Sequence, residues 1–146
     1  MTFVSLGHAT ATAGCLPATS VAAKPADRGR EIFEGSEPLE GAIRGHRDRL
    51  PPVVVRCRNC HATSDDGTKP SGTAAPKLDA ALLIQQRPRR GGPPSAYDRQ
   101  TFCKLLRTGI DPAFVLIGRE MPVYDLSDAQ CASLWGFLTS SRTTGG

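Results

Sequence analysis

Apolar residues recur at helical spacing in several parts of the chain and predict a mainly α-helical domain. The clearest stripe lies near the C-terminus, where residues at i, i+3, i+4 and i+7 are apolar. Ser127 precedes this stripe and is followed by Gln130, which is the pattern of a capping box at a helix start. The buried face of this helix is expected to consist of Cys131, Leu134, Trp135 and Leu138.

A first helix is predicted at about 27–34, with Asp27 at its N-cap position. Gly29 and Phe33 lie on one face of this helix together with Ile32, because residues three and four apart are neighbours on a helix surface. Since Gly29 has no side chain, a second helix can approach closely at this position.

Three further helices are predicted between these two. One begins at Pro51 and Pro52, because proline is tolerated in the first helical turn, and continues through residues 57–61. Another covers residues 78–86. The third opens at Ser95–Asp98, interpreted as a capping box, and ends at Gly109 as its C-cap.

The segments between these helices are expected to be irregular. Residues 34–56 are interpreted as an insertion, residues 63–75 contain turn signals, and residues 112–124 are expected to form an extended loop. No alternating strand pattern competes with the helices. The sequence therefore predicts an all-α fold for a domain that spans residues 27–140.

Length and charge limit the possible functions. The 146 residues suit one domain, and the formal net charge of +4 is spread over interspersed basic and acidic residues. No basic run is interleaved with aromatic residues, so a nucleic-acid partner is not expected. The mild positive charge suggests acidic protein partners at most. No stretch of about 20 apolar residues is present that would span a membrane.

The N-terminal residues have the character of an export signal. Residues 1–15 carry no charge and resemble the end of a secretory leader, and residues 16–26 are expected to form a flexible tether. The segment from Thr12 to Cys15 resembles a lipoprotein cleavage box, which would make Cys15 a lipidated first residue. The alternative is an ordinary leader with an incidental cysteine. Residues 141–146 are expected to form a polar tail.

The segment Cys57-Arg58-Asn59-Cys60-His61 carries the strongest chemical signal in the chain. Cys-x-x-Cys-His is the attachment motif of c-type haem: two thiols add to the haem vinyl groups, and the histidine that follows ligates the iron. A redox-active dithiol or half of a zinc site is the alternative interpretation. The dithiol would need a βαβ context and the zinc site further ligands in suitable spacing, and the sequence offers neither.

The second axial ligand is predicted by elimination to be Met121, the only methionine besides Met1. Pro122 follows it and favours an extended backbone at Met121. The competing ligand is His46, which lies in the polar insertion and is interpreted as a surface residue.

A segment after the motif is expected to complete the surroundings of the haem. A ligating histidine normally donates its other ring N–H to a carbonyl oxygen, and Pro76 is predicted to supply it for His61. Leu78 is expected to pack on the porphyrin.

Two cysteines remain after this assignment, Cys103 and Cys131. Both fall on predicted helices, and two leftover cysteines in an oxidising compartment are expected to form a disulfide. The alternative is that both are buried thiols that serve as small apolar residues.

Taken together, these residues resemble a class I cytochrome c over about residues 26–140. The resemblance implies one covalent haem c and a close crossing of the first and last helices, in which Gly29 and Phe33 would meet Leu134 and Trp135. The insertion at 34–56 and the Cys103–Cys131 pair depart from the family pattern. The insertion could cover a haem edge, form a partner surface or supply His46.

The resemblance implies a function as well as a fold. It implies a monohaem carrier of single electrons in the periplasm, with redox proteins as partners and no catalytic residues of its own. Two alternatives stay open: an electron-accepting haem subunit of an oxidoreductase complex, and a haem sensor or enzyme in which the methionine ligand is displaced.

Overall fold

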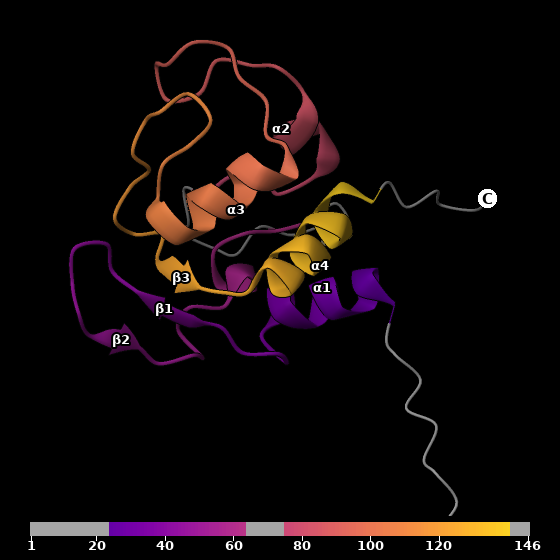
Figure 1. The fold of residues 1–146 in the computed structure, drawn as a ribbon, viewed down its shortest axis with the longest axis vertical. Helices are drawn as coiled ribbons and strands as arrows, with labels where there is room; N and C mark the ends of the chain where they lie inside the picture. The colour runs from indigo at the N-terminus through magenta and orange to yellow at the C-terminus, as the bar shows by residue number, and fades with distance from the viewer. Residues whose placement is uncertain (1–23, 64–74, 141–146) are drawn as a thin grey trace, which may run out of the picture.

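The computed structural model describes residues 24–63 and 75–140. These residues form four helices and a small sheet of three strands (Figure 1). The helices are α1 (Pro25–Glu34), α2 (Ala80–Ile84), α3 (Arg99–Thr108) and α4 (Asp128–Thr139), and the strands are β1 (Glu40–Ala42), β2 (Arg49–Leu50) and β3 (Val123–Asp125). The expected all-α fold is therefore corrected: the domain is largely helical but mixed. The leader at 1–15, most of the tether and the tail at 141–146 lie outside the described residues.

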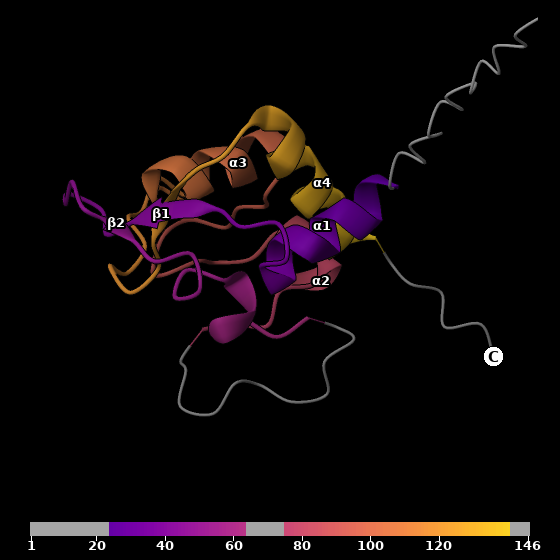
Figure 2. The ribbon, with the colours of Figure 1, turned by 90° about the horizontal axis from the view of Figure 1, so that it is seen from below.

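The first and last helices cross closely, as Gly29 predicts. Figures 1 and 2 both show α1 lying across α4. A Cβ atom at Gly29 would collide with the backbone carbonyl of Ser133 and with Cβ of Phe137. Helix α1 starts at Pro25 rather than after Asp27, and it ends at Gly35, whose φ of 85° is in the left-handed region.

The partners in this crossing differ from those that the resemblance implies. Phe33 packs against Phe137, with ring centroids 5.7 Å apart, whereas Trp135 is only partly buried and packs on Phe102 of α3 at 5.3 Å. The reason is that α4 is apolar on more than one face. The face that meets α1 carries Ser133 and Phe137, whereas Cys131 and Trp135 of the predicted stripe contact α3.

Helix α3 begins three residues later than the start predicted at Ser95–Asp98. The N-cap is Asp98, whose carboxylate accepts a hydrogen bond from the backbone N–H of Thr101 at 2.7 Å. The Thr101 hydroxyl accepts in return from the N–H of Asp98 at 2.9 Å. The helix ends at Gly109, as predicted, with a φ of 72°. Helix α2 likewise begins later than the predicted 78–86, because the Asp79 side chain caps its start by accepting from Leu82 N–H, and it ends at Ile84.

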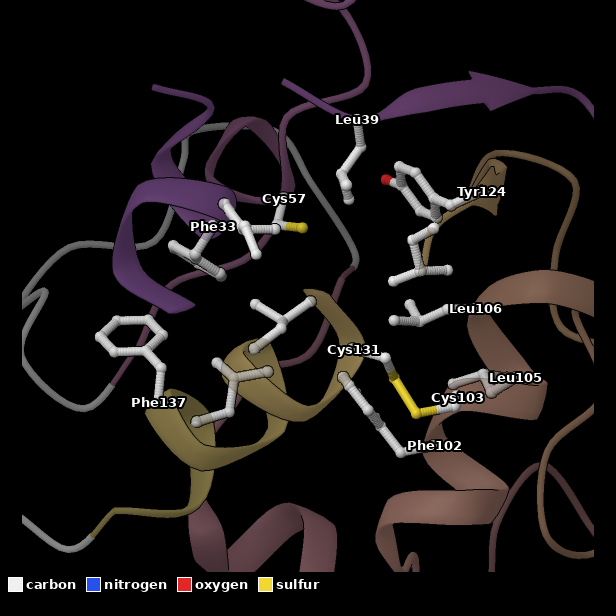
Figure 3. Close-up of a cluster of buried hydrophobic side chains, with 14 of the residues drawn as sticks. Phe33, Leu39, Cys57, Phe102, Cys103, Leu105, Leu106, Tyr124, Cys131 and Phe137 are labelled. Atoms are coloured by element: carbon white, nitrogen blue, oxygen red, sulfur yellow. A yellow bond between two sulfur atoms is a disulfide. The ribbon is translucent and has the colours of Figure 1, made fainter. Parts of the chain in front are cut away.

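A disulfide between Cys103 and Cys131 joins α3 to α4 in the middle of the core, as predicted from the cysteine count (Figure 3). Cys131 is completely buried. Around the bridge, α1, α3 and α4 contribute the large apolar side chains of one continuous cluster.

The insertion at 34–56 is ordered by a sheet, which the sequence did not predict. Strand β1 lies between β2 and β3 and is antiparallel to both, with Gly41 opposite Tyr124. Strand β3 follows directly on Met121 and Pro122. The insertion is thus bound to the segment that carries the predicted second ligand. In the described part of the chain, no helix is both long and apolar enough to span a membrane.

Candidate functional site

The Cys57–His61 motif lies on a tight turn and not on the predicted α-helix. Residues Cys57–Asn59 form one 3-10 turn, and the N–H of His61 donates to the carbonyl of Cys57 at 2.9 Å. The Asn59 side-chain amide donates to the carbonyls of Val53 and Val54, at 2.9 and 3.0 Å. A helix running on from Pro51 would need these carbonyls for its own backbone bonds, so Asn59 replaces that helix by a turn.

The two thiols of the motif differ in environment. Cys57 is buried and lines a cavity, whereas Cys60 is exposed. Burial raises the pKa of the Cys57 thiol to about 12, so that it stays protonated at neutral pH. Redox-active Cys-x-x-Cys pairs depend on a thiolate with a lowered pKa. The environment of Cys57 therefore disfavours dithiol chemistry.

His61 is held in one tautomer by the segment that follows the motif. Its Nδ1 lies 2.8 Å from the carbonyl oxygen of Pro76, the acceptor predicted from the sequence. Because a carbonyl can only accept, Nδ1 carries the proton and Nε2 keeps its lone pair. Burial also lowers the pKa of His61, which favours the neutral imidazole that a metal requires. The backbone N–H of Leu78 donates to Ala62 at 2.8 Å and fixes this segment beside the motif.

His61 and Met121 open into the same cavity, which has a volume of about 260 Å³. Its walls are mostly apolar and come from the motif, from α2, α3 and α4, and from the segments between them. The lining residues are Cys57, His61, Pro76, Leu78, Leu82, Leu83, Arg87, Pro88, Arg89, Arg90, Tyr97, Phe102, Leu105, Leu106, Ile117, Met121, Tyr124, Leu134 and Leu138.

The cavity brings together most of the residues predicted for the site. Besides His61 and Met121 it contains Cys57, with Pro76 and Leu78 from the segment after the motif. The competing ligand, His46, is exposed in the turn between β1 and β2 and does not line the cavity. Among the described residues, no three His, Cys, Asp or Glu side chains are grouped so that they could bind a metal ion.

The loop before Met121 is held by a network that sequence reasoning missed. Asp111 is buried, and its carboxylate accepts from the N–H groups of Ala113 and Val115, both at 2.9 Å. Arg44, from the insertion, donates to the carbonyl of Ile117 at 2.8 Å. An isolated arginine in a polar stretch gave no sequence signal for this contact across the fold.

Arg87, Arg89 and Arg90, which directly follow the helix predicted at 78–86, also line the cavity. Their sequence alone carries no signal for this position. Comparison of the chain with profiles of known protein families, with curated proteins and with solved structures yields no match.

Proposed function

We propose that this chain is a monohaem c-type cytochrome that carries single electrons. In this proposal Cys57 and Cys60 would hold the haem through thioether bonds, and His61 and Met121 would ligate its iron. The observation that carries the proposal is the meeting of Cys57, His61 and Met121 at one apolar cavity.

The donor set fits haem iron. The neutral imidazole of His61 presents Nε2, because Nδ1 is bonded to Pro76. The thioether of Met121 is a soft neutral ligand of the kind found opposite histidine in electron-carrying cytochromes. Haem iron, when bound, supplies a one-electron couple. The apolar walls and the methionine both favour a high reduction potential.

Ligation by both His61 and Met121 would favour a carrier over an enzyme. With both residues bound to the iron, no position would be left for a substrate, and the site would serve electron transfer. Redox proteins are then the partners. Because covalent haem attachment in bacteria occurs outside the inner membrane, the same proposal implies a periplasmic protein, which lipidation of Cys15 would anchor to the membrane.

Covalent haem is the property that tests the proposal. The full chain, produced in a host that can mature c-type cytochromes, should gain the mass of one haem and keep haem colour on a denaturing gel. The variant C57A/C60A should lose both signals. The variant C103A/C131A is the matched control, because it also lacks two cysteines but should keep the haem. A wild-type chain without covalent haem would contradict the proposal.

Carbon monoxide separates the carrier from the sensor or enzyme alternative. If Met121 stays on the iron, the reduced protein should bind carbon monoxide weakly or slowly. Tight and rapid binding would favour a haem sensor or enzyme with a displaceable methionine.

A further inference from the structure

The insertion holds both ends of the segment that carries Met121. On the C-terminal side of Met121, Ala42 of β1 is paired with Val123 of β3. On the N-terminal side, Nη2 of Arg44 donates a hydrogen bond to the carbonyl of Ile117 at 2.8 Å. Ala42 and Arg44 are close neighbours in the sequence. One short stretch of the insertion therefore binds the chain both before and after the methionine.

Arg44 fixes the base of the loop that precedes Met121. Its Nη1 lies 3.5 Å from the carbonyl oxygen of Gly109, which also accepts a hydrogen bond from the N–H of Ile117 at 2.9 Å. A Cβ atom at Gly109 would collide with this guanidinium. Ile117 is buried and lines the cavity. Arg44 thus connects the end of α3 to the residue at which the loop returns to the cavity.

The contact between Arg44 and the loop is of a strong kind. The side chain is half-buried, and it forms no ion pair with a carboxylate of the described residues. Hydrogen bonds from a charged donor are stronger than those between neutral groups, and a guanidinium presents a planar fork of donors that can reach two oxygens at once. The fork of Arg44 is therefore directed at backbone carbonyls, where it restrains the path of the chain.

We propose that Arg44 is a positioning residue for Met121, through which the insertion keeps the methionine sulfur directed at the haem iron. This inference rests on the proposed function. Residues that support a metal ligand from outside the coordination sphere typically change affinity or activity by about 10–100-fold when they are lost. With Arg44 in place, Met121 resists displacement from the iron. Without it, the site opens to small ligands, which is the behaviour of the sensor or enzyme alternative.

Imidazole binding to the ferric, haem-loaded full chain tests this role, because imidazole competes with Met121 for the iron. In Arg44→Gln the affinity for imidazole should rise by about 10–100-fold. Arg44→Lys, whose single ammonium group has no fork to span both carbonyls, should give a smaller rise. The matched control is Arg47→Gln, which removes the same charge from an exposed position in the turn between β1 and β2 and should bind imidazole like the wild type.

An affinity in Arg44→Gln no higher than that in Arg47→Gln would overturn the proposal. Where Arg44→Gln fails to fold, Arg44→Lys decides by the same comparison with Arg47→Gln.

Hydrogen exchange adds a readout that does not depend on the iron. In the full chain, the amide of Ile117 should exchange about tenfold faster in either Arg44 variant than in the wild type, because a hydrogen bond from a charged group is lost or weakened. The amide of Leu106, within α3, should keep its rate. Equal acceleration at both amides would indicate a general loss of stability and would contradict a specific role of Arg44.

The two measurements separate this inference from the proposed function. Faster exchange at Ile117 with an unchanged affinity for imidazole would mean that Arg44 supports only the fold, and the positioning role would be wrong while the proposed function stands. A wild-type chain that carries no haem overturns the proposed function itself, and the exchange rates would then still report whether Arg44 holds the loop.

Discussion

The hydroxyl of Tyr124 donates a hydrogen bond to the backbone carbonyl of Val55 at 2.9 Å. Both residues are buried. Val55 lies just before Cys57, and Tyr124 lies just after Met121. This one contact therefore links the segments that carry the two sides of the candidate haem site. Burial strongly raises the pKa of Tyr124, so the hydroxyl remains protonated and able to donate at neutral pH.

Removal of this hydroxyl should destabilise the domain. In Tyr124→Phe the carbonyl of Val55 stays buried without its donor, which typically costs about 1–3 kcal/mol. Urea unfolding followed by circular dichroism measures the loss. Tyr97→Phe is the control, because the Tyr97 hydroxyl makes no hydrogen bond among the described residues. Equal losses in the two variants would show that the bond to Val55 contributes nothing specific.

The crossing of α1 and α4 should be sensitive to one methyl group. In Gly29→Ala the new Cβ would meet Ser133 and Phe137, so the helices must separate. Such overpacking costs about 1–3 kcal/mol. In Gly136→Ala, on α4, the new Cβ meets nothing within 4 Å, and alanine should stabilise the helix by up to about 1 kcal/mol. Thermal unfolding should show a lower melting temperature for Gly29→Ala and an equal or higher one for Gly136→Ala. An unchanged melting temperature in Gly29→Ala would refute the close crossing.

Features that depend on the chemistry of one residue or of a few neighbouring residues could be predicted from the sequence. The capping box at Ser127 and Gln130 is present, with the Ser127 side chain accepting from Gln130 N–H at 3.2 Å. Gly29 indicated the helix crossing because only glycine tolerates it. The acceptor for His61 followed from the need of a ligating histidine for a carbonyl partner.

Features that depend on contacts between distant segments could not be predicted. Strands β1 and β2 have three and two residues, too few for an alternating pattern, and they exist because they pair with each other and with β3. The helix expected from Pro51 fails because Asn59 takes its carbonyls. Arg89 gave no signal, since its burial depends on how the segment between α2 and α3 folds back over the cavity.

The bridge between Cys103 and Cys131 should make a large contribution to stability. The cysteines are 28 residues apart, and closing a loop of this length in the unfolded chain corresponds to about 3–4 kcal/mol. A reducing agent should lower the melting temperature of the wild type but not that of C103A/C131A. Two titratable thiols at these positions in the unfolded, oxidised protein would contradict the pairing.

Stability should fall in acid partly through Glu37. Two donor groups of Arg28 bind its carboxylate, both at 2.8 Å, and the Gln130 amide donates to it at 2.9 Å. The bond from Arg28 lowers the pKa of Glu37 in the folded state. The stability that the Glu37 carboxylate contributes is therefore fully present above the ordinary pKa of glutamate. It is lost as the pH falls through the lower pKa that Glu37 has in the folded state.

The variant Glu37→Gln isolates this effect. Its melting temperature should be lower than that of the wild type at pH 7. The difference between the two melting temperatures should shrink as the pH is lowered into the acid range. Glu34→Gln is the control, because Glu34 forms no ion pair with any described residue. A constant difference between Glu37→Gln and the wild type at all pH values would exclude the carboxylate as its source.

Substitution of Met121 should change the iron and not the fold, if the proposed function holds. Met121 is only partly buried, and its backbone is fixed on both sides, by the loop that Arg44 holds and by strand β3. In Met121→Ala the ferric protein should lose its sulfur-to-iron charge-transfer band, the reduction potential should fall, and the reduced protein should bind carbon monoxide readily.

Leu82→Ala is the control, because it removes apolar bulk from the same cavity but no proposed iron ligand, and it should keep the band. A band that persists in Met121→Ala would mean that another group ligates the iron, and the assignment of Met121 would have to be abandoned while covalent attachment at Cys57 and Cys60 could still stand.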